Sequence, residues 1–488
     1  MQILVVVNQN DNWPLNIEGV QIVTSRVYLS DPQFSLMRRV RVFNLCKSYS
    51  YQSVGYYVSL LAEARGHKPF PDVYNLMSMQ SQQIVRFISD DLDELIQKSL
   101  APLKSKRFDL SIYFGSNMAK RYDKLSQKLF NTLQAPFLRA SFVKHKKWML
   151  QKASPIASKD ISLTHWPFVV SAAEDYFRKK RKVSPRKVET RFDLAILVAP
   201  DEKQSPSNER AIKKFMKAAA SLNLGVELIQ KEDYGRLAEF DALFIRETTS
   251  VNHHTYNFAR KAAIQGLVVI DDPESILKCT NKVFLAELLQ RHKIPIPKTM
   301  IAHRDNMAQV SAALGLPCIL KQPDSSFSQG VMKVETEKDL QEKMKMLLAS
   351  SEMIIAQQFL PTDFDWRIGI LDKKPLFACR YYMAKGHWQI INYGKTGKIL
   401  EGNADAIAFD DVPEPVMNTA LKAANLIGDG LYGVDLKQIG KKVYVIEVND
   451  NPNIDAGMED RILQDELYLT VMQSFVRRIE DRKLVAKK

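Results

Sequence analysis

The stretch GVDLKQIGKKVYVIEVNDNPN, residues 433–453, decides the fold of the carboxy-terminal half of the chain. Residues 434–439 and 443–449 have strand character and flank a Gly-Lys-Lys turn, which predicts a β-hairpin. With a three-residue turn, Asp435 lies directly opposite Glu447, and such cross-strand partners are about 5 Å apart. Asn449 lies on the same face as Glu447, because side chains alternate along a strand. Three oxygen-bearing side chains are therefore expected on one patch.

Two carboxylates at this spacing favour a bound cation, because without one they would repel each other in a dry sheet. Hard oxygen ligands suit Mg²⁺, which commonly completes its shell with phosphate oxygens and water. The hairpin thus predicts a platform for a metal–nucleotide complex. The alternative is a solvated, acidic sheet edge. It is disfavoured because the flanking strand is apolar enough to be buried on both faces, through Val443, Val445, Ile446 and Val448.

Length and composition indicate a globular protein of several domains. A chain of 488 residues exceeds one ordinary core, so about two to four domains are expected. The formal charge of +14 favours anionic ligands such as nucleotides, phosphate or acidic substrates, without distinguishing them. The four cysteines are far apart and show no CxxC spacing, so neither a zinc site nor a disulfide framework is expected.

The start of the chain, MQILVVVNQND, reads as a first strand, because it lacks a basic n-region and a cleavage pattern. No apolar run has the length of a membrane span. These features and the scattered cysteines together predict a cytoplasmic protein that does not associate with membranes.

Residues 1–177 are expected to form an α/β domain. Strands are predicted at 3–7 and 110–114, and helices at 53–64, 83–100 and 120–133. The aromatic segment 43–57 is interpreted as packing. The basic run RKKRKVSPRK, within residues 178–191, is interpreted as a linker and not as a polyanion patch.

From residue 192 to 275, strands alternate with helices, which predicts a small parallel sheet covered on its faces. Sites in such sheets lie at the carboxyl ends of strands. Arg246, Glu247, His253 and His254 follow one such end and are candidates for lining a substrate cleft. The alternative, that the histidines merely start a helix, is equally weighted. The histidine pair is not expected to bind metal, because neighbours on a helix point in different directions.

Residues 274–300 predict one helix ending before Pro295, with Lys282 near its start, where amide donors and the helix dipole favour an anion. Residues 316–334 predict a strand, a loop and a second strand. Lys321 ends the first strand, and small residues in the loop allow backbone amides to approach phosphates, namely Ser325, Ser326, Ser328 and Gly330. The alternative is an ordinary surface hairpin loop.

Residues 365–383 predict a second hairpin. Asp365 and Arg367 point to the same face by alternation, and Arg380 comes from the returning strand. A carboxylate here suits ribose hydroxyls, whereas a guanidinium holds phosphate oxygens in a fork. A surface ion pair would give the same pattern.

In this order, the elements of residues 192–480 resemble the ATP-grasp superfamily, most closely the RimK-type carboxylate–amine ligases. The resemblance implies an α/β and α+β multidomain fold: an N-terminal extension, a pre-ATP-grasp open parallel sheet (192–275) and a two-lobed ATP-grasp domain (276–480, small lobe about 300–357). Residues 481–488 are left as a basic tail. The first 190 residues resemble the extension found on some RimK-like proteins, to which no chemistry is assigned.

The resemblance also implies roles for individual residues. Lys282 and Lys321 match the phosphate lysines, Asp365 matches the ribose carboxylate, and Arg367 and Arg380 fall in the strand pair that faces the phosphates and the acceptor. The hinge that reads adenine is Gln357, Gln358, Phe359 and Leu360, and the magnesium ligands are Asp435, Glu447 and Asn449. Gly330 stands alone where relatives are often richer in glycine, and Gln358 replaces a frequent Glu.

The implied reaction is ligation. A carboxylate attacks the γ-phosphate of ATP, and an amine captures the acyl phosphate, while residues 324–330 are the candidate lid that excludes water. The expected cofactors are ATP and two Mg²⁺ ions, with Mn²⁺ as a substitute. The substrate is expected to be glutamate or a similar amino acid joined to an acceptor, with Arg246, His253 and Lys385 as substrate contacts. A homo-oligomer is one alternative for the assembly. Competing functions are a regulatory ATP binder and a nucleic-acid module, the latter disfavoured by the missing recognition motif.

Overall fold

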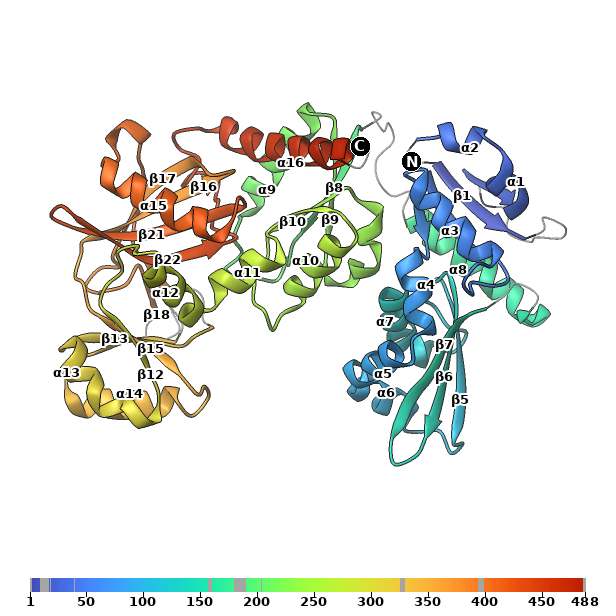
Figure 1. Ribbon diagram of the computed structural model, residues 1–488, viewed down its shortest axis with the longest axis horizontal. Coiled ribbons are helices and arrows are strands. Elements are labelled where there is room, and N and C mark those ends of the chain that lie inside the picture. The colour runs from blue at the N-terminus through green and yellow to red at the C-terminus, as the bar shows by residue number, and fades with distance from the viewer. Residues whose placement is uncertain are drawn as a thin grey trace. The chain divides into compact units, whose positions relative to one another are not determined.

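A computed structural model of the chain describes residues 2–8, 17, 19–38, 40–156, 160–179, 190–202, 204–324, 330–393 and 399–485 (Figure 1). The chain divides into two compact units. Unit 1 comprises Met1–Lys187 and Asp233–Glu239, and unit 2 comprises Val188–Glu232 and Phe240–Lys488. Both contain helices and several sheets, so the predicted mixed α/β and α+β class is confirmed.

Unit 1 begins with a parallel sheet of order β2-β1-β3-β4. Its strands are apolar and β-branched, as in the buried QILVVV of the central β1. They run β1 Gln2–Val7, β2 Val20–Thr24, β3 Val40–Asn44 and β4 Lys68–Phe70. The helices between and after them are α1 Ser25–Ser30, α2 Gln33–Leu36, α3 Val54–Ala64 and α4 Val73–Gln80.

An antiparallel sheet of order β5-β6-β7 completes unit 1. Its strands are β5 Arg107–Tyr113, β6 Phe137–Lys144 and β7 Trp148–Pro155, accompanied by α5 Gln82–Asp91, α6 Asp93–Leu100, α7 Asp123–Leu133 and α8 Trp166–Lys179. The prediction of one helix over 83–100 is wrong, because the chain leaves helical geometry at Leu92 (φ −99°, ψ 12°). Residues 180–189 of the basic run lie outside the described residues.

Unit 2 also begins with a parallel sheet, of order β11-β10-β8-β9. The strands are β8 Phe192–Leu197, β9 Leu224–Ile229, β10 Ala242–Ile245 and β11 Val268–Ile270, and the helices are α9 Glu209–Ser221 and α10 His254–Ile264. The last helix, α16 (Asp465–Val485), packs on α9, with the rings of Tyr468 and Phe215 4.7 Å apart. The expectation of a tail over 481–488 is therefore wrong up to residue 485, since these residues continue α16.

The two parallel sheets are copies of one design. In both, the first strand is central, the second lies beside it, and the third and fourth follow on the other side. The helices α3, α4 and α5 of unit 1 begin and end 200 positions before α10, α11 (Pro273–Thr280) and α12 (Lys282–Arg291) of unit 2. Gly66 and Gly266 take the same positive φ (71° and 74°) after α3 and α10. The sequence patterns did not predict this repeat.

Helices α11 and α12 replace the single helix predicted for residues 274–300. The break is Asn281, which has extended backbone and caps α12 by accepting hydrogen bonds from the amides of Val283 and Phe284 at 3.1 and 3.0 Å. A capping Asn favours a helix start over a helix interior. Lys282 thereby becomes the first residue of α12.

The small lobe is an antiparallel sheet of order β12-β15-β13-β14 with its own core beneath two helices. Its elements are β12 Thr299–Ala302, α13 Val310–Leu314, β13 Cys318–Lys321, β14 Val331–Val334, α14 Glu337–Leu347 and β15 Ile354–Gln358. Residues 325–329, which include Ser326 and Ser328, lie outside the described residues.

The large lobe is a five-stranded sheet of order β20-β17-β16-β21-β22, with α15 (Glu414–Ile427) packed on one face. Its strands are β16 Phe364–Leu371, β17 Lys374–Tyr382, β20 Ala404–Ala406, β21 Leu431–Ile439 and β22 Lys442–Asp450, and a separate pair is formed by β18 Ile391–Tyr393 and β19 Ile399–Glu401. Single 3₁₀ turns lie at η1 Lys120–Tyr122, η3 Leu163–His165, η4 Lys231–Glu239, η5 Arg304–Gln309 and η6 Phe409–Asp411.

The decisive hairpin, β21–β22, has the predicted pairing but not the predicted turn. Asp435 pairs with Glu447, yet Ile439 pairs with Lys442, so the turn holds two residues instead of three. A β-bulge at Ile446 adds one residue to β22 and so compensates for the shorter turn. Beyond the bulge the pairing is the predicted one, with Asp435 opposite Glu447. The expectation of burial on both faces is also wrong: Val445 and Val448 are buried, whereas Glu447 and Asn449 are half-buried.

The four cysteines all lie in the described part of the chain. Cys46, Cys279, Cys318 and Cys379 are all free and buried. Within the described ranges, none of the helices combines the length and the apolar character needed to cross a membrane.

Candidate active site

A cavity of about 360 Å³ lies within unit 2. The small lobe contributes β13 and the hinge after β15, the large lobe contributes β16, β17, β21 and β22, and further walls come from the start of α12 and the loop after β10. Of the predicted residues, the cavity is lined by Lys282, Lys321, Gln357, Gln358, Phe359, Leu360, Asp365, Arg367, Asp435, Glu447 and Asn449. Residues more than 160 positions apart in the chain thus share one chamber.

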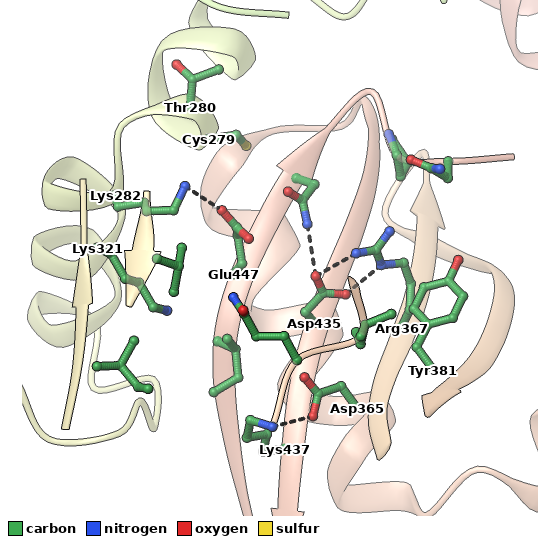
Figure 2. Close-up of a pocket in the computed structure, with 18 of the residues that line it drawn as sticks. Cys279, Thr280, Lys282, Lys321, Asp365, Arg367, Tyr381, Asp435, Lys437 and Glu447 are labelled. Atoms are coloured by element: carbon green, nitrogen blue, oxygen red, sulfur yellow. Dashed lines mark hydrogen bonds and ion pairs between the residues drawn. The ribbon is translucent and has the colours of Figure 1, made fainter. Parts of the chain in front are cut away.

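The three predicted metal ligands line the cavity from β21 and β22, and Figure 2 shows Asp435 and Glu447 among them. The Asn449 amide donates to Asp435 Oδ2 at 3.1 Å. Glu447 Oε1 accepts from Lys282 Nζ at 2.9 Å. Asp435 receives a fork from Arg367, whose Nε and Nη2 lie 2.5 and 2.7 Å from Oδ1 and Oδ2. The cluster is therefore held together by cationic side chains.

The electrostatics of the cluster suit a divalent ion. Burial by itself raises the pKa of Glu447, but the charges of Lys282 and Lys321 outweigh it and lower that pKa below its ordinary value. Burial raises the pKa of Asp435, and the bond from Arg367 opposes this rise. Each of the two carboxylates retains lone pairs that these contacts do not use, and oxygen donors are what Mg²⁺ requires. The residues present therefore fit a magnesium site.

Two lysines provide positive charge opposite this cluster. Lys282 is buried at the start of α12, where its own amide donates to the carbonyl of Pro323 at 2.9 Å. Lys321, at the end of β13, points into the cavity (Figure 2). Burial lowers the pKa of Lys321 to about 8, against the opposing charge of Glu447. An anionic ligand between the lysines would restore its full charge.

The hinge and a neighbouring ion pair form the other end of the cavity. Gln357 uses its side chain to bond Thr299 Oγ1 at 2.9 Å, and the amide of Gln358 donates to the carbonyl of Lys298 at 2.8 Å. Asp365 Oδ1 accepts from Lys437 Nζ at 2.6 Å. The predicted ribose carboxylate is therefore already paired with a lysine.

The prediction that Arg380 faces the phosphates is wrong. Arg380 pairs with Trp366 across β16–β17, and directly paired residues share a face of the sheet. That face carries the α15 core, and the Arg380 guanidinium lies 4.6 Å from the Trp366 ring centroid. Side-chain alternation along β16 predicted that Asp365 and Arg367 share a face. It did not predict which face of the sheet Arg380, on the neighbouring strand β17, would occupy.

The expected substrate contacts are also placed elsewhere. Arg246 is fully buried, and its guanidinium donates to Asn451 Oδ1 at 2.7 Å, Pro452 O at 2.8 Å and Ser207 Oγ at 2.9 Å, so it fastens loops instead of meeting substrate. Lys385 is exposed and does not line the cavity. His253 lies beyond residues 248–250, which do line it.

Among the cavity residues that sequence reasoning missed, two extend the patterns it had used. Lys437 lies two positions after Asp435 on the same strand face, and Tyr381 pairs directly with Asp365. The Arg367 guanidinium lies 4.8 Å from the Tyr381 ring centroid, and the Tyr381 hydroxyl donates to the buried Glu459 carboxylate. The same two-residue alternation and cross-strand pairing used for Asp365 and Asp435 would have identified both.

Comparison with known families places this geometry. Residues 279–465 match the RimK-like ATP-grasp domain, and residues 25–172 match the RimK-like ATPgrasp N-terminal domain. The chain is a RimK-like ATP-grasp protein. The first match spans all of the cavity residues from α11, α12, both lobes and the metal cluster.

Named relatives of this RimK-like ATP-grasp protein are ligases. It is 25% identical over 234 residues to a probable alpha-L-glutamate ligase of Vibrio vulnificus (strain YJ016), covering 47% of this chain and 74% of the relative. It is 28% identical over 195 residues to the alpha-aminoadipate–LysW ligase LysX of Saccharolobus solfataricus. The match covers 38% of this chain and 67% of the relative.

Two solved structures are similar to part of the chain. A RimK domain ATP-grasp protein from Sphaerobacter thermophilus has a TM-score of 0.45 at 15% identity and covers 58% of this chain and 98% of its own. The D-alanine–D-alanine ligase of Bacillus anthracis has a TM-score of 0.46 at 14% identity. The match covers 59% of this chain and 99% of the ligase.

Proposed function

We propose that the protein is an ATP- and Mg²⁺-dependent, ADP-forming carboxylate–amine ligase that joins an amino acid to an acceptor. One observation carries the proposal: an oxygen-donor cluster on β21–β22 faces two lysines across a cavity that the hinge closes at its other end. The sequence similarity to glutamate and aminoadipate ligases supports the same class of reaction.

We propose the following roles for the residues. The backbone of residues 357–360 receives the adenine, Asp365 and Lys437 receive the ribose edge, and Lys282 and Lys321 hold phosphate oxygens. Asp435, Glu447 and Asn449 would hold Mg²⁺, which supplies neutralisation of phosphate charge when bound. Mn²⁺ substitution and a second ion remain predictions.

Phosphoryl transfer needs positioning and charge neutralisation more than a nucleophilic side chain. Arg367 is fixed by its fork to Asp435 and by the Tyr381 ring, so its guanidinium lines the cavity in a set orientation. In the proposed sequence, the substrate carboxylate attacks the γ-phosphorus and ADP leaves. An amine then attacks the acyl carbon, phosphate leaves, and an amide forms with loss of one proton from the nitrogen; the acceptor bears either this amine or the activated carboxylate.

Glutamate is our proposed amino acid, because the cavity carries cationic side chains and one relative is named for that substrate. The acceptor is proposed as a peptide, a metabolite or a protein tail. We also propose that residues 276–480 form the catalytic domain, 192–275 the sheet that precedes it and 1–177 a separate extension. The cytoplasmic location and the oligomeric state stay predictions.

The test is release of ADP and phosphate from Mg²⁺-ATP across a panel of amino acids and acidic peptides, with mass spectrometry of the products. The proposal predicts amino-acid-dependent turnover and a product heavier than the acceptor by one residue. Tight ATP binding without turnover on any member of a broad panel, including protein acceptors, would favour the regulatory ATP binder instead.

A further inference from the structure

Three side chains that can ligate a metal gather at the carboxyl end of β10, outside the proposed magnesium cluster. Glu247, His253 and His254 each offer one ligand atom, and these atoms all lie within 4.8 Å of one another. The expectation that the adjacent histidines diverge is wrong. His253 caps α10 in extended backbone (φ −127°, ψ 160°), so only His254 is helical, and the two ring centroids are 3.9 Å apart.

The separations within this group are close to those of a coordination shell. His254 Nε2 lies 2.7 Å and His253 Nε2 4.0 Å from Glu247 Oε1. Ligand atoms around a tetrahedral Zn²⁺ are about 3.3 Å apart, given metal–ligand bonds of about 2.0–2.1 Å. The two observed distances lie on either side of this value, so shifts of less than an ångström would bring each histidine nitrogen to that distance from Glu247 Oε1.

The hydrogen bonds of the two histidines bear on how they could coordinate a metal. His254 Nε2 is buried and lies 2.7 Å from Glu247 Oε1, yet it forms no hydrogen bond among the described residues. His253 Nδ1 meets Thr255 Oγ1 at 3.1 Å, and that hydroxyl donates to the carbonyl of Thr248 at 3.4 Å. A proton on Nδ1 leaves the Nε2 lone pair of His253 toward Glu247, as in zinc sites where an outer partner fixes the tautomer.

The local charge favours a cation. Glu247 is buried, and the half-buried Glu202 acts electrostatically on both Glu247 and His254 while its carboxylate accepts from the amide of Thr248 at 3.2 and 3.3 Å. The start of α10 and the exposed Lys231 oppose a cation. The negative charges of Glu202 and Glu247 together exceed the positive charges that oppose a cation, which are about half a charge at the helix start and one charge on the solvated Lys231.

We propose that Glu247, His253 and His254 form a separate site for a divalent transition-metal ion, best matched by Zn²⁺. Two imidazoles and one carboxylate leave the fourth position open. The site adjoins residues 248–250, which line the cavity, so the ion would fix this wall of the substrate chamber. The repeated sheet of unit 1 has Lys47, Ser53 and Val54 at the positions 200 residues earlier and offers no such ligands.

The test is titration of the chelator-treated full chain with Co²⁺ and Zn²⁺, without ATP or Mg²⁺. We expect one equivalent of Co²⁺ to give the intense visible absorption of tetrahedral coordination and Zn²⁺ to displace it. His253→Ala, His254→Ala and Glu247→Gln should each weaken binding at least about tenfold. Equal binding by the wild type and all three variants, or binding without the tetrahedral spectrum, would overturn the proposal.

Two controls separate this site from others. His303→Ala removes another half-exposed histidine beside a carboxylate, 3.7 Å from Asp305, and should leave Co²⁺ binding unchanged. Asp435→Asn removes a proposed magnesium ligand and should also leave it unchanged. Loss of the Co²⁺ spectrum in Asp435→Asn, with retention in His253→Ala, would assign the ion to the nucleotide cavity instead.

Folding is monitored in the same variants. The His253 side chain is 41% exposed, so its truncation should leave the melting temperature of the metal-free protein unchanged. Zn²⁺ should raise the melting temperature of the wild type by a few degrees and not that of His253→Ala, because an ion that binds only the folded state stabilises it. An equal rise in both would count against the site.

Discussion

The parallel sheets of unit 1 and unit 2 share strand order and helix boundaries but differ in the residues at their functional ends. Helix α12 begins with Lys282, which reaches the metal cluster, whereas α5 begins with the exposed Gln82. Asp72 and Asp272 cap α4 and α11 in the same way. The repeat thus retains the residues that build the scaffold and differs in those that would carry charge to a ligand.

A second difference lies beyond the parallel sheets. Unit 2 continues into the large lobe, whose β21 and β22 carry the proposed magnesium ligands, whereas the described part of unit 1 has no counterpart of that five-stranded sheet. The proposed reaction uses the oxygen-donor cluster and the lysines together, and the described part of unit 1 has no counterpart of the sheet that carries the cluster. We therefore expect nucleotide chemistry in unit 2 alone.

The largest expected effect comes from the metal cluster. Glu447→Gln or Asp435→Asn should lower ATP turnover by about 100-fold or more, because the charge that balances Mg²⁺ is lost. Far-UV circular dichroism should show an unchanged fold. The matched control is Asp109→Asn at an exposed position of β5 in unit 1, which should keep wild-type turnover. Normal turnover in either cluster variant would reject the metal assignment.

Alanine substitutions at the two equivalent helix starts test the comparison of the two sheets directly. Lys282→Ala should raise the Kd for Mg²⁺-ATP by about tenfold to 100-fold, since a charge-assisted contact is lost and Glu447 loses its partner. Gln82→Ala at the same place in unit 1 should have no effect. Isothermal titration calorimetry measures both. Equal losses of affinity would show that unit 1 also takes part in nucleotide binding.

The pKa of Lys321 predicts a pH dependence for nucleotide affinity. Burial lowers this pKa to about 8, and bound phosphate raises it, so ATP binding takes up a proton above pH 8. Affinity should therefore be steady below pH 8 and fall above it, by up to about tenfold per pH unit. Lys321→Arg should flatten the profile, because arginine stays protonated. A wild-type affinity that does not change between pH 7 and 9 would contradict the assignment.

The smallest effect is expected from Arg380. Arg380→Met should leave turnover nearly unchanged and lower stability by about 1 kcal/mol, because it removes a cation–π contact with Trp366 on the α15 side of the sheet. Steady-state kinetics and denaturant unfolding measure the two quantities. A loss of turnover comparable with that of Glu447→Gln would return Arg380 to the reaction site.

Local rules account for the part of the site that the sequence predicted. Asp435 and Glu447 were paired correctly because hydrophobic patterning fixes strand register, even though the turn was one residue too long and the bulge at Ile446 compensated for it. Arg246 shows where these rules stop. Its position after β10 marked it as functional, but only the packing of residues 206, 451 and 452 around it reveals a fully bonded structural role.

The sequence by itself determined most of the strands and the pairing of Asp435 with Glu447, and it predicted a nucleotide–metal platform near the carboxy terminus. These features depend on neighbours a few residues apart, which spacing encodes. Three features were decided by the tertiary structure alone. Arg367 forms an ion pair with Asp435, and Arg380 lies on the face of the sheet that is turned away from the cavity. His253 and His254 both lie close to Glu247. Such contacts depend on how whole helices and strands pack and on the backbone angles of single capping residues such as His253. A linear pattern of residue types contains neither.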